Sequence, residues 1–249
     1  MEHIERLERE REFHNLRFAD DSEREQRTGR FYAAIAYGFE RYRQRVGEAC
    51  DGKRLLEYGC GADGLSYDMA ARAASVVGID ISDVAIAEAQ RLAKERALHN
   101  LKFQVDDAEA MSFAPHSFDT VAGTGIIHHL DIERSARELR RVLRPGGVAI
   151  FAEPLGHNPL LNWYRHRTPE LRTVDEHPLL AADLRTMAAH FKSIRVTYFG
   201  LIAPGLGIIS RHARPRSFVT RGVWWLDRQL CRIPYLRRFA WYCIVELYA

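Results

Sequence analysis

The stretch "LLEYGCGADGLS", residues 55–66, decides the fold of this chain. An apolar, strand-like run ends in a loop whose Gly59, Gly61 and Gly64 fit the spacing G-x-G-x-x-G, and a helix-like segment follows. Glycine lets a ligand approach the backbone closely, and such a turn directs backbone N–H groups toward it. The pattern therefore predicts the first strand–loop–helix unit of an α/β fold, with a nucleotide-like ligand at the loop.

Length and composition limit the possible classes of protein. A chain of 249 residues suffices for one large α/β domain, and we expect a single domain over residues 1–249. The net charge of +3 is too small to indicate nucleic-acid binding, and no nucleic-acid partner is expected. The four cysteines show no C-x-x-C spacing, the first residues are charged, and no apolar run reaches the length of a membrane span. We therefore expect free thiols, a cytoplasmic location and no transmembrane helix.

Strands and helices alternate from residue 53 onward, which predicts a parallel sheet with helices on both faces. Residues 1–50 are helical in pattern and mostly polar, and we expect them to cap a ligand-binding core at residues 51–155. Asp83 and Asp131 are each expected to cap a helix, the first of them running to about residue 98. The expected strands are residues 54–59, 75–80, 101–105, 117–123, 148–154, 193–200 and 241–249.

Three acidic residues distinguish the ligands that the glycine loop could hold. Glu57 lies two residues before Gly59, where its carboxylate would repel a dinucleotide pyrophosphate and attract the ammonium group of S-adenosylmethionine (SAM). Asp80, at the end of the second strand, could bind the ribose hydroxyls of either ligand. Asp107 follows the third strand and could accept a hydrogen bond from an adenine amino group. Glu57 and Asp107 therefore favour SAM over a nicotinamide dinucleotide.

Five ordered motifs resemble the class I SAM-dependent methyltransferase family, in its UbiE-like, methyltransferase type 11 group. They are "LLEYGCGADG", "VVGIDIS", "DDAEAMSF", "SFDTVAGTGIIHHL" and "LRPGGVAIFAEP". The resemblance covers residues 50–155 well and the C-terminal strands loosely, with Asp63 where the family often has a third glycine. It implies a Rossmann-like, doubly wound sheet of seven strands, mostly parallel with an antiparallel C-terminal strand and helices on both faces. It also implies SAM as the cofactor and S-adenosylhomocysteine as its product.

The resemblance further implies nine residues as cofactor contacts. The methionine part and the sulfonium would be contacted by Glu57, Gly59, Gly61 and Gly123, the ribose and adenine by Asp80, Ile81, Asp107 and Ala108, and the whole ligand would be covered by Tyr32. For Tyr32, an ordinary core aromatic is an equally favoured interpretation. For Asp107, the alternative is a polar residue in a solvated turn.

Candidates for a catalytic base follow from the reaction itself. Methyl transfer from a sulfonium needs a nucleophile held in line, and a hydroxyl or amine acceptor must also lose a proton. His128, Glu153 and His157 follow strands at the edge where ligands bind in open α/β folds, and we predict them as catalytic residues. The adjacent His128 and His129 cannot easily both face one site. A buried hydrogen-bonded pair is the alternative for Glu153 and His157.

Two insertions, residues 156–179 and 201–238, are expected to build the acceptor pocket or a lid over it. The first carries arginines beside aromatic residues, and the second joins an apolar run to an Arg-rich amphipathic stretch. An apolar and cationic pocket would suit a hydrophobic acid, a phenol or a phosphorylated lipid-like metabolite. An equally favoured alternative is a lid that only packs on the core, with its arginines in solvent. The basic segment 201–238 could also rest on an anionic membrane.

The predicted function is therefore methyl transfer from SAM to a small apolar or anionic metabolite, with O-methylation favoured over C- or N-methylation. An NAD-dependent oxidoreductase using the same glycine loop and a non-catalytic SAM-binding regulator are the alternatives. Residues 175–177, "DEH", have the composition of metal ligands. Without a second cluster of such residues we expect a polar turn there and no metal site.

Overall fold

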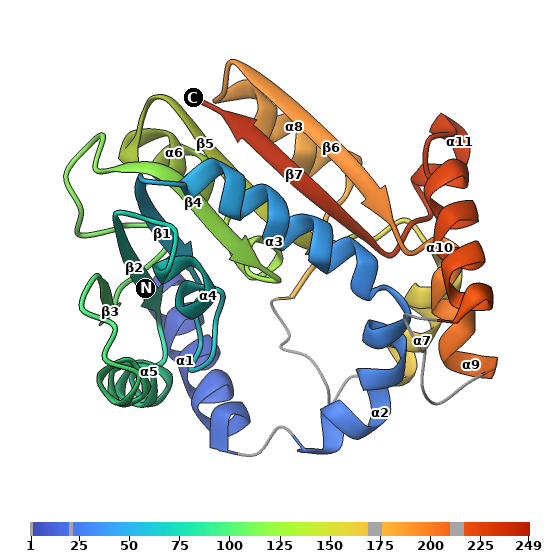
Figure 1. The fold of residues 1–249 in the computed structure, drawn as a ribbon, viewed down its shortest axis with the longest axis horizontal. Coiled ribbons are helices and arrows are strands. Elements are labelled where there is room, and N and C mark those ends of the chain that lie inside the picture. Colours follow the sequence, from blue (N-terminus) through green and yellow to red (C-terminus); the bar gives the residue numbers. More distant parts are fainter. Residues whose placement is uncertain (1, 20–21, 169–175, 210–216) are drawn as a thin grey trace.

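A seven-stranded sheet forms the centre of the structure, with the strand order β3-β2-β1-β4-β5-β7-β6 (Figure 1). The computed structural model describes residues 2–19, 22–168, 176–209 and 217–249. The strands are β1 (Arg54–Tyr58), β2 (Ser75–Asp80), β3 (Leu101–Val105), β4 (Phe118–Thr124), β5 (Leu143–Pro154), β6 (Ser193–Phe199) and β7 (Tyr242–Tyr248). The pairs among β1 to β5 are parallel, and β7 runs antiparallel to both of its neighbours, β5 and β6. The predicted Rossmann-like sheet with an antiparallel C-terminal strand is confirmed.

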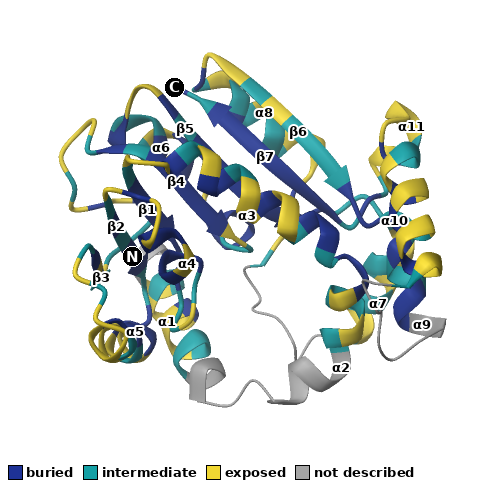
Figure 2. Cartoon of the chain, in the orientation of Figure 1, coloured by how far each residue is buried: buried dark blue, intermediate teal, exposed yellow. Residues whose placement is uncertain are grey.

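Helices cover both faces of the sheet because its central strands are apolar on both sides. Neighbouring side chains of a strand point to opposite faces, so Leu55 and Leu56, both fully buried, enter two separate hydrophobic clusters. One cluster includes residues of α3 (Ala36–Cys50), α4 (Ser66–Ala70) and α5 (Asp83–Glu95), and the other includes residues of α6 (Ile132–Val142) and α8 (Ala181–Ala189). Figure 2 shows the central strands buried between these two layers.

The remaining helices lie at the ends of the strands and along their edges (Figure 1). They are α1 (Glu2–Ala19), α2 (Ser22–Ala34), the 3-10 helix η1 (Ile127–His129), α7 (Pro159–Arg167), the 3-10 helix η3 (Ala203–Gly205), α9 (Leu206–Ile209), α10 (Phe218–Leu230) and α11 (Pro234–Arg237). Helix α1 packs against α5, and α2 packs against η3 and α9. The N-terminal helices thus bridge the sheet and the second insertion.

Two helix starts test the predicted caps. Asp131 caps α6 as predicted, because its side chain accepts a hydrogen bond from the Arg134 N–H at 2.9 Å. The predicted cap Asp83 is wrong, since Ser82 occupies the N-cap position of α5 and its hydroxyl accepts from the Ala85 N–H at 3.0 Å. Helix α5 also ends at Glu95, before the predicted end near residue 98.

The four cysteines are free thiols, as predicted, and all four are buried. Over the part of the chain that the structure describes, no helix is both long enough and apolar enough to cross a bilayer.

Candidate active site

A cavity of about 1170 Å³ opens at the carboxyl ends of β1, β2 and β4, where ligands bind in open α/β sheets. Its wall includes Gly59 after β1, Asp80 at the end of β2 and Thr124 at the end of β4. Small-molecule pockets usually enclose about 300–1,000 Å³. The cavity therefore has room for a nucleoside-sized cofactor and a second small molecule.

Seven of the nine predicted cofactor contacts line this cavity. They are Tyr32, Gly59, Gly61, Asp80, Ile81, Asp107 and Ala108. Gly123 does not line the cavity. It packs against the Phe151 ring so closely that a Cβ atom at this position would lie 2.8 Å from the ring. The following residues, Thr124 and Gly125, form the wall instead.

Glu57 holds the glycine loop from behind. Its Oε1 accepts a hydrogen bond from the Leu65 N–H and its Oε2 accepts from the Ser66 N–H, each at 2.7 Å. The Ser66 hydroxyl donates a further bond to Oε2. The side chain is buried outside the cavity wall, and this burial raises the pKa of Glu57 to about 7 against the effect of its hydrogen bonds. Glu57 was expected to face the ligand. Its carboxylate instead fixes the start of α4.

Asp80 supports the same loop from the cavity side. Its Oδ2 accepts from the Gly61 N–H and its Oδ1 accepts from the Ser82 N–H, both at 2.9 Å. A carboxylate has about four acceptor positions, so Asp80 keeps acceptor capacity for the two hydroxyls of a ribose. Gly59 and Gly61 adopt positive φ values of 61° and 54°, which side-chain-bearing residues rarely adopt. The remaining acceptor positions of Asp80 fit the ribose hydroxyls of SAM.

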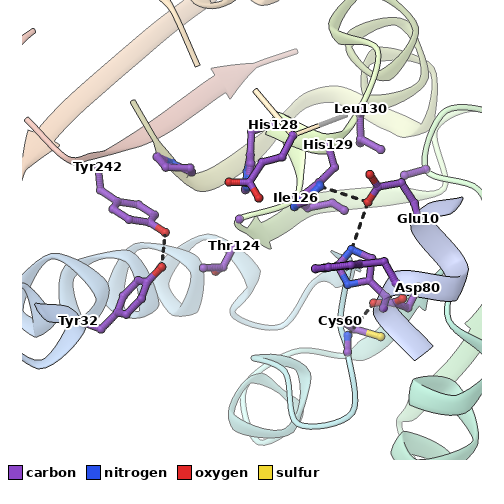
Figure 3. Close-up of a pocket in the computed structure, with 18 of the residues that line it drawn as sticks. Glu10, Tyr32, Cys60, Asp80, Thr124, Ile126, His128, His129, Leu130 and Tyr242 are labelled. Atoms are coloured by element: carbon purple, nitrogen blue, oxygen red, sulfur yellow. Dashed lines mark hydrogen bonds and ion pairs between the residues drawn. The ribbon is translucent and has the colours of Figure 1, made fainter. Parts of the chain in front are cut away.

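His128 is the predicted base that reaches the cavity. It lies in η1, lines the cavity (Figure 3) and is buried. Its Nδ1 lies 2.8 Å from Glu153 Oε2. Burial lowers the pKa of His128 below its ordinary value, and the hydrogen bond to Glu153 opposes this shift. A neutral His128 therefore donates its Nδ1–H to Glu153, and its Nε2 carries the lone pair.

Glu153 and His157 do not reach the cavity. The fully buried Glu153 accepts bonds from the Ile126 and Ile127 N–H groups at 3.0 Å, so it fixes η1 and His128 together. His157 accepts a hydrogen bond from the Ala181 N–H at 3.0 Å, at the start of α8. The alternative interpretation, a hydrogen-bonded Glu153–His157 pair, does not hold either, because both side chains bond to other groups. Glu153 positions the histidine, and His157 supports a helix start away from the reacting groups.

Sequence reasoning missed a cluster of side chains on the same wall. Glu10 and His14 of α1 reach His129, and Glu176 lies 3.8 Å from His128 Nε2. The neighbouring Asp175 of the predicted polar turn lies outside the described residues. The i, i+4 spacing of an acid and a histidine on one helix was the available signal.

The first insertion supplies the apolar part of the cavity wall. Its lining residues are Leu160, Leu161, Trp163, Tyr164, Arg165 and Glu176, and β7 and the residue before it add Tyr242 and Trp241. None of the described residues of the second insertion, 201–209 and 217–238, lines the cavity. The expectation that segment 201–238 builds the acceptor pocket is therefore not met by its described part.

Comparison with known proteins finds methyltransferases among the relatives of this chain. Residues 56–151 match the methyltransferase domain family. The chain is 36% identical over 165 residues to a sterol 24-C-methyltransferase from Aspergillus fumigatus, covering 65% of this chain and 41% of that protein. It is 36% identical over 118 residues to a ubiquinone biosynthesis O-methyltransferase from Pseudomonas fluorescens, covering 47% of this chain and 49% of that protein.

Solved structures agree on the fold. The YcgJ protein from Bacillus subtilis superposes with a TM-score of 0.60 at 18% identity, covering 84% of this chain and 98% of that one. The chain spans about half the length of the curated relatives that it matches. The match over residues 56–151 and the methyltransferase relatives together support a class I SAM-dependent methyltransferase. These matches argue against the oxidoreductase alternative.

Proposed function

We propose that this protein transfers the methyl group of SAM to an oxygen atom of a small, apolar or anionic metabolite. The observation that carries the proposal is the hydrogen bond between His128 Nδ1 and the buried Glu153, on the wall of a cavity that also contains the glycine loop. A carboxylate bonded to one ring nitrogen fixes the tautomer, so that the other nitrogen can act as a base.

Each part of the site has a separate task in this proposal. SAM supplies an activated methyl group, so the protein has to orient the acceptor and remove its proton. His128 Nε2 takes the proton of an acceptor hydroxyl, and Glu153 stabilises the imidazolium that forms. Such general-base catalysis typically contributes about 10²–10⁴-fold to the rate.

The cavity wall supports an apolar acceptor with a negative group. Trp163, Tyr164 and Leu161 offer apolar surface, and Arg43 and Arg165 line the same cavity. Two relatives are named as methyltransferases of a sterol and of a ubiquinone precursor pathway, which supports small, apolar acceptors. By their names, the sterol methyltransferase methylates a carbon atom and the ubiquinone biosynthesis methyltransferase an oxygen atom. The relatives therefore do not decide between the two, and our choice of oxygen rests on the histidine base.

The test is a methyl-transfer screen with isotope-labelled SAM against hydrophobic acids, phenols and isoprenoid phosphates, each beside its O-blocked analogue. We expect transfer to a compound with a free hydroxyl or acid and none to the blocked analogue. Transfer that survives blocking of every oxygen would contradict O-methylation. Tight SAM binding without transfer to any compound would favour the non-catalytic regulator.

We also propose that α10 and α11 contact anionic membranes, from which an apolar acceptor could be drawn. The apolar side chains Phe218, Trp225 and Tyr235 are exposed by 88%, 59% and 65%. Exposed arginines of the same two helices, Arg221 and Arg228 among them, stand beside these apolar side chains. Apolar side chains flanked by arginines are the composition of interfacial helices.

A further inference from the structure

Glu10, His14 and His129 meet on the cavity wall, although they come from α1 and from η1. Figure 3 shows Glu10 beside His129. The proposed methyl transfer uses none of them. We propose that these three side chains bind a divalent transition metal ion of the Zn²⁺ class, with an open coordination position toward the cavity.

The distances between the ligand atoms fit a shared metal ion better than they fit direct hydrogen bonds between the side chains. Glu10 Oε2 lies 3.4 Å from His14 Nε2 and 3.3 Å from His129 Nδ1, and all three atoms lie within 4.8 Å of one another. Hydrogen bonds of this kind are usually about 2.7–3.2 Å long. Ligands bound at about 2.0–2.1 Å in a tetrahedron stand about 3.4 Å apart, which matches both separations.

The chemistry of the three groups is equally specific. Two imidazoles and one carboxylate are the ligand set of many catalytic Zn²⁺ sites, in which a water or a substrate takes the fourth position. Glu10 and His129 are exposed by only 6% and 7%, so their polar atoms lie largely out of bulk water. Because all three residues line the cavity, the fourth position is open to its interior.

Other contacts hold α1 against η1 and α5 and thereby bring the ligands together. Arg6, one turn before Glu10, donates a hydrogen bond to the His129 carbonyl at 3.1 Å and forms an ion pair with Glu109. Asn15, next to His14, donates to the Asp83 carboxylate at 3.0 Å. Glu10 and His14 are neighbours on one helix face because four residues separate them. The three ligands are therefore preorganised by contacts that do not involve the metal.

A second group, His128, His129 and Glu176, shares His129 and also has ligand atoms within 4.8 Å. Its His128 Nε2 and Glu176 Oε1 are 3.8 Å apart, farther than the edge of a tetrahedral site. In the proposed methyl transfer, His128 Nε2 must also stay free of metal, because it accepts the proton of the acceptor hydroxyl. We therefore assign the metal to Glu10, His14 and His129.

Metal binding can be measured on the full chain without any acceptor, so the result is independent of the proposed methyl transfer. The chain is freed of metal with a chelator and titrated with Co²⁺, whose visible bands report the coordination number, and then with Zn²⁺ in competition. We expect one ion per chain and the intense bands of a four- or five-coordinate site. Bound metal should also slow amide hydrogen exchange in α1, which carries two of the ligands.

Variants identify the ligands. Glu10→Gln, His14→Gln and His129→Gln should each weaken Zn²⁺ binding more than about 100-fold, beyond the 10–100-fold effect of losing an outer-shell partner. Glu12→Gln, an exposed glutamate on the same helix, should bind the metal like the original chain, as should Glu176→Gln. Far-UV circular dichroism checks that each variant is folded. The proposal is overturned if the chain binds no metal, or if binding persists in the first three variants or depends on Glu176.

Discussion

Replacement of Glu153 by glutamine should disable the base while leaving the cavity intact. The carboxylate accepts three hydrogen bonds, two from backbone N–H groups at 3.0 Å and one from His128 Nδ1 at 2.8 Å. A glutamine that keeps its oxygen on the backbone groups turns its NH₂ group toward Nδ1. Because that NH₂ group only donates, His128 must carry its proton on Nε2, where it can no longer accept one. We expect the rate of methyl transfer to fall about 10²–10⁴-fold.

The same change should cost stability, since charge-assisted bonds become neutral ones. Hydrogen bonds to charged groups contribute about 1.5–3 kcal/mol and neutral ones about 0.5–1.5 kcal/mol. For the fully buried Glu153 we expect a loss of about 1–3 kcal/mol in the free energy of unfolding. SAM affinity should stay unchanged, because Glu153 does not line the cavity.

Two measurements and one control make this prediction decisive. Two-dimensional ¹H–¹⁵N spectra of histidine-labelled protein report which ring nitrogen of His128 carries the proton, and urea unfolding gives the stability. Glu246→Gln is the matched control, because this buried glutamate of β7 accepts from Arg45 and Tyr248 outside the cavity wall. It should lose stability without losing rate. A Glu153→Gln chain with the original tautomer or with the full rate would refute the reasoning.

Four further outcomes are expected. Asp80→Ala should raise the dissociation constant of SAM about 10–100-fold in calorimetry, because one or two bonds to a charged group are lost; unchanged affinity would contradict the ribose assignment. Burial lowers the pKa of His128, so the neutral base persists below the ordinary value of 6.5, and the acidic limb of kcat/KM should lie below pH 6.5. A limb above pH 7 would exclude His128 as that base. Glu57→Gln should lower the free energy of unfolding by about 1–3 kcal/mol in urea, because an amide nitrogen cannot accept the bonds from the start of α4; an unaltered urea midpoint would show that these bonds do not matter. Phe218→Glu should reduce flotation with vesicles of anionic lipid, and equal flotation would count against membrane contact by α10.

The strands could be predicted from the sequence because buried parallel strands are continuous apolar runs. Residues 75–80 and 101–105 are strands over the predicted residues. Helix α7 was not predicted within the insertion 156–179, although Asn158 before Pro159 is a helix-start signal. The Asn158 side chain accepts from the Leu160 and Leu161 N–H groups.

The site residues could be predicted only where a polar side chain stands at the end of a strand or directly after it. Asp80 and Asp107 line the cavity because the carboxyl ends of parallel strands meet at one edge. Sequence does not show which way a carboxylate turns, so the contact of Glu57 with α4 was not foreseen. The meeting of His14 with His129 depends on how α1 packs across the folded sheet, which no local pattern specifies.

Strand β7 has a consequence for how this protein is made. It is the last strand in sequence, yet it lies between β5 and β6. During synthesis on a ribosome, β6 therefore emerges with no strand to pair with until β7 arrives. Tyr242 of β7 also meets Tyr32 of α2 at the cavity, with their hydroxyls 3.3 Å apart. A nascent or truncated chain that stops before residue 242 should lack both the sheet edge and a closed binding site.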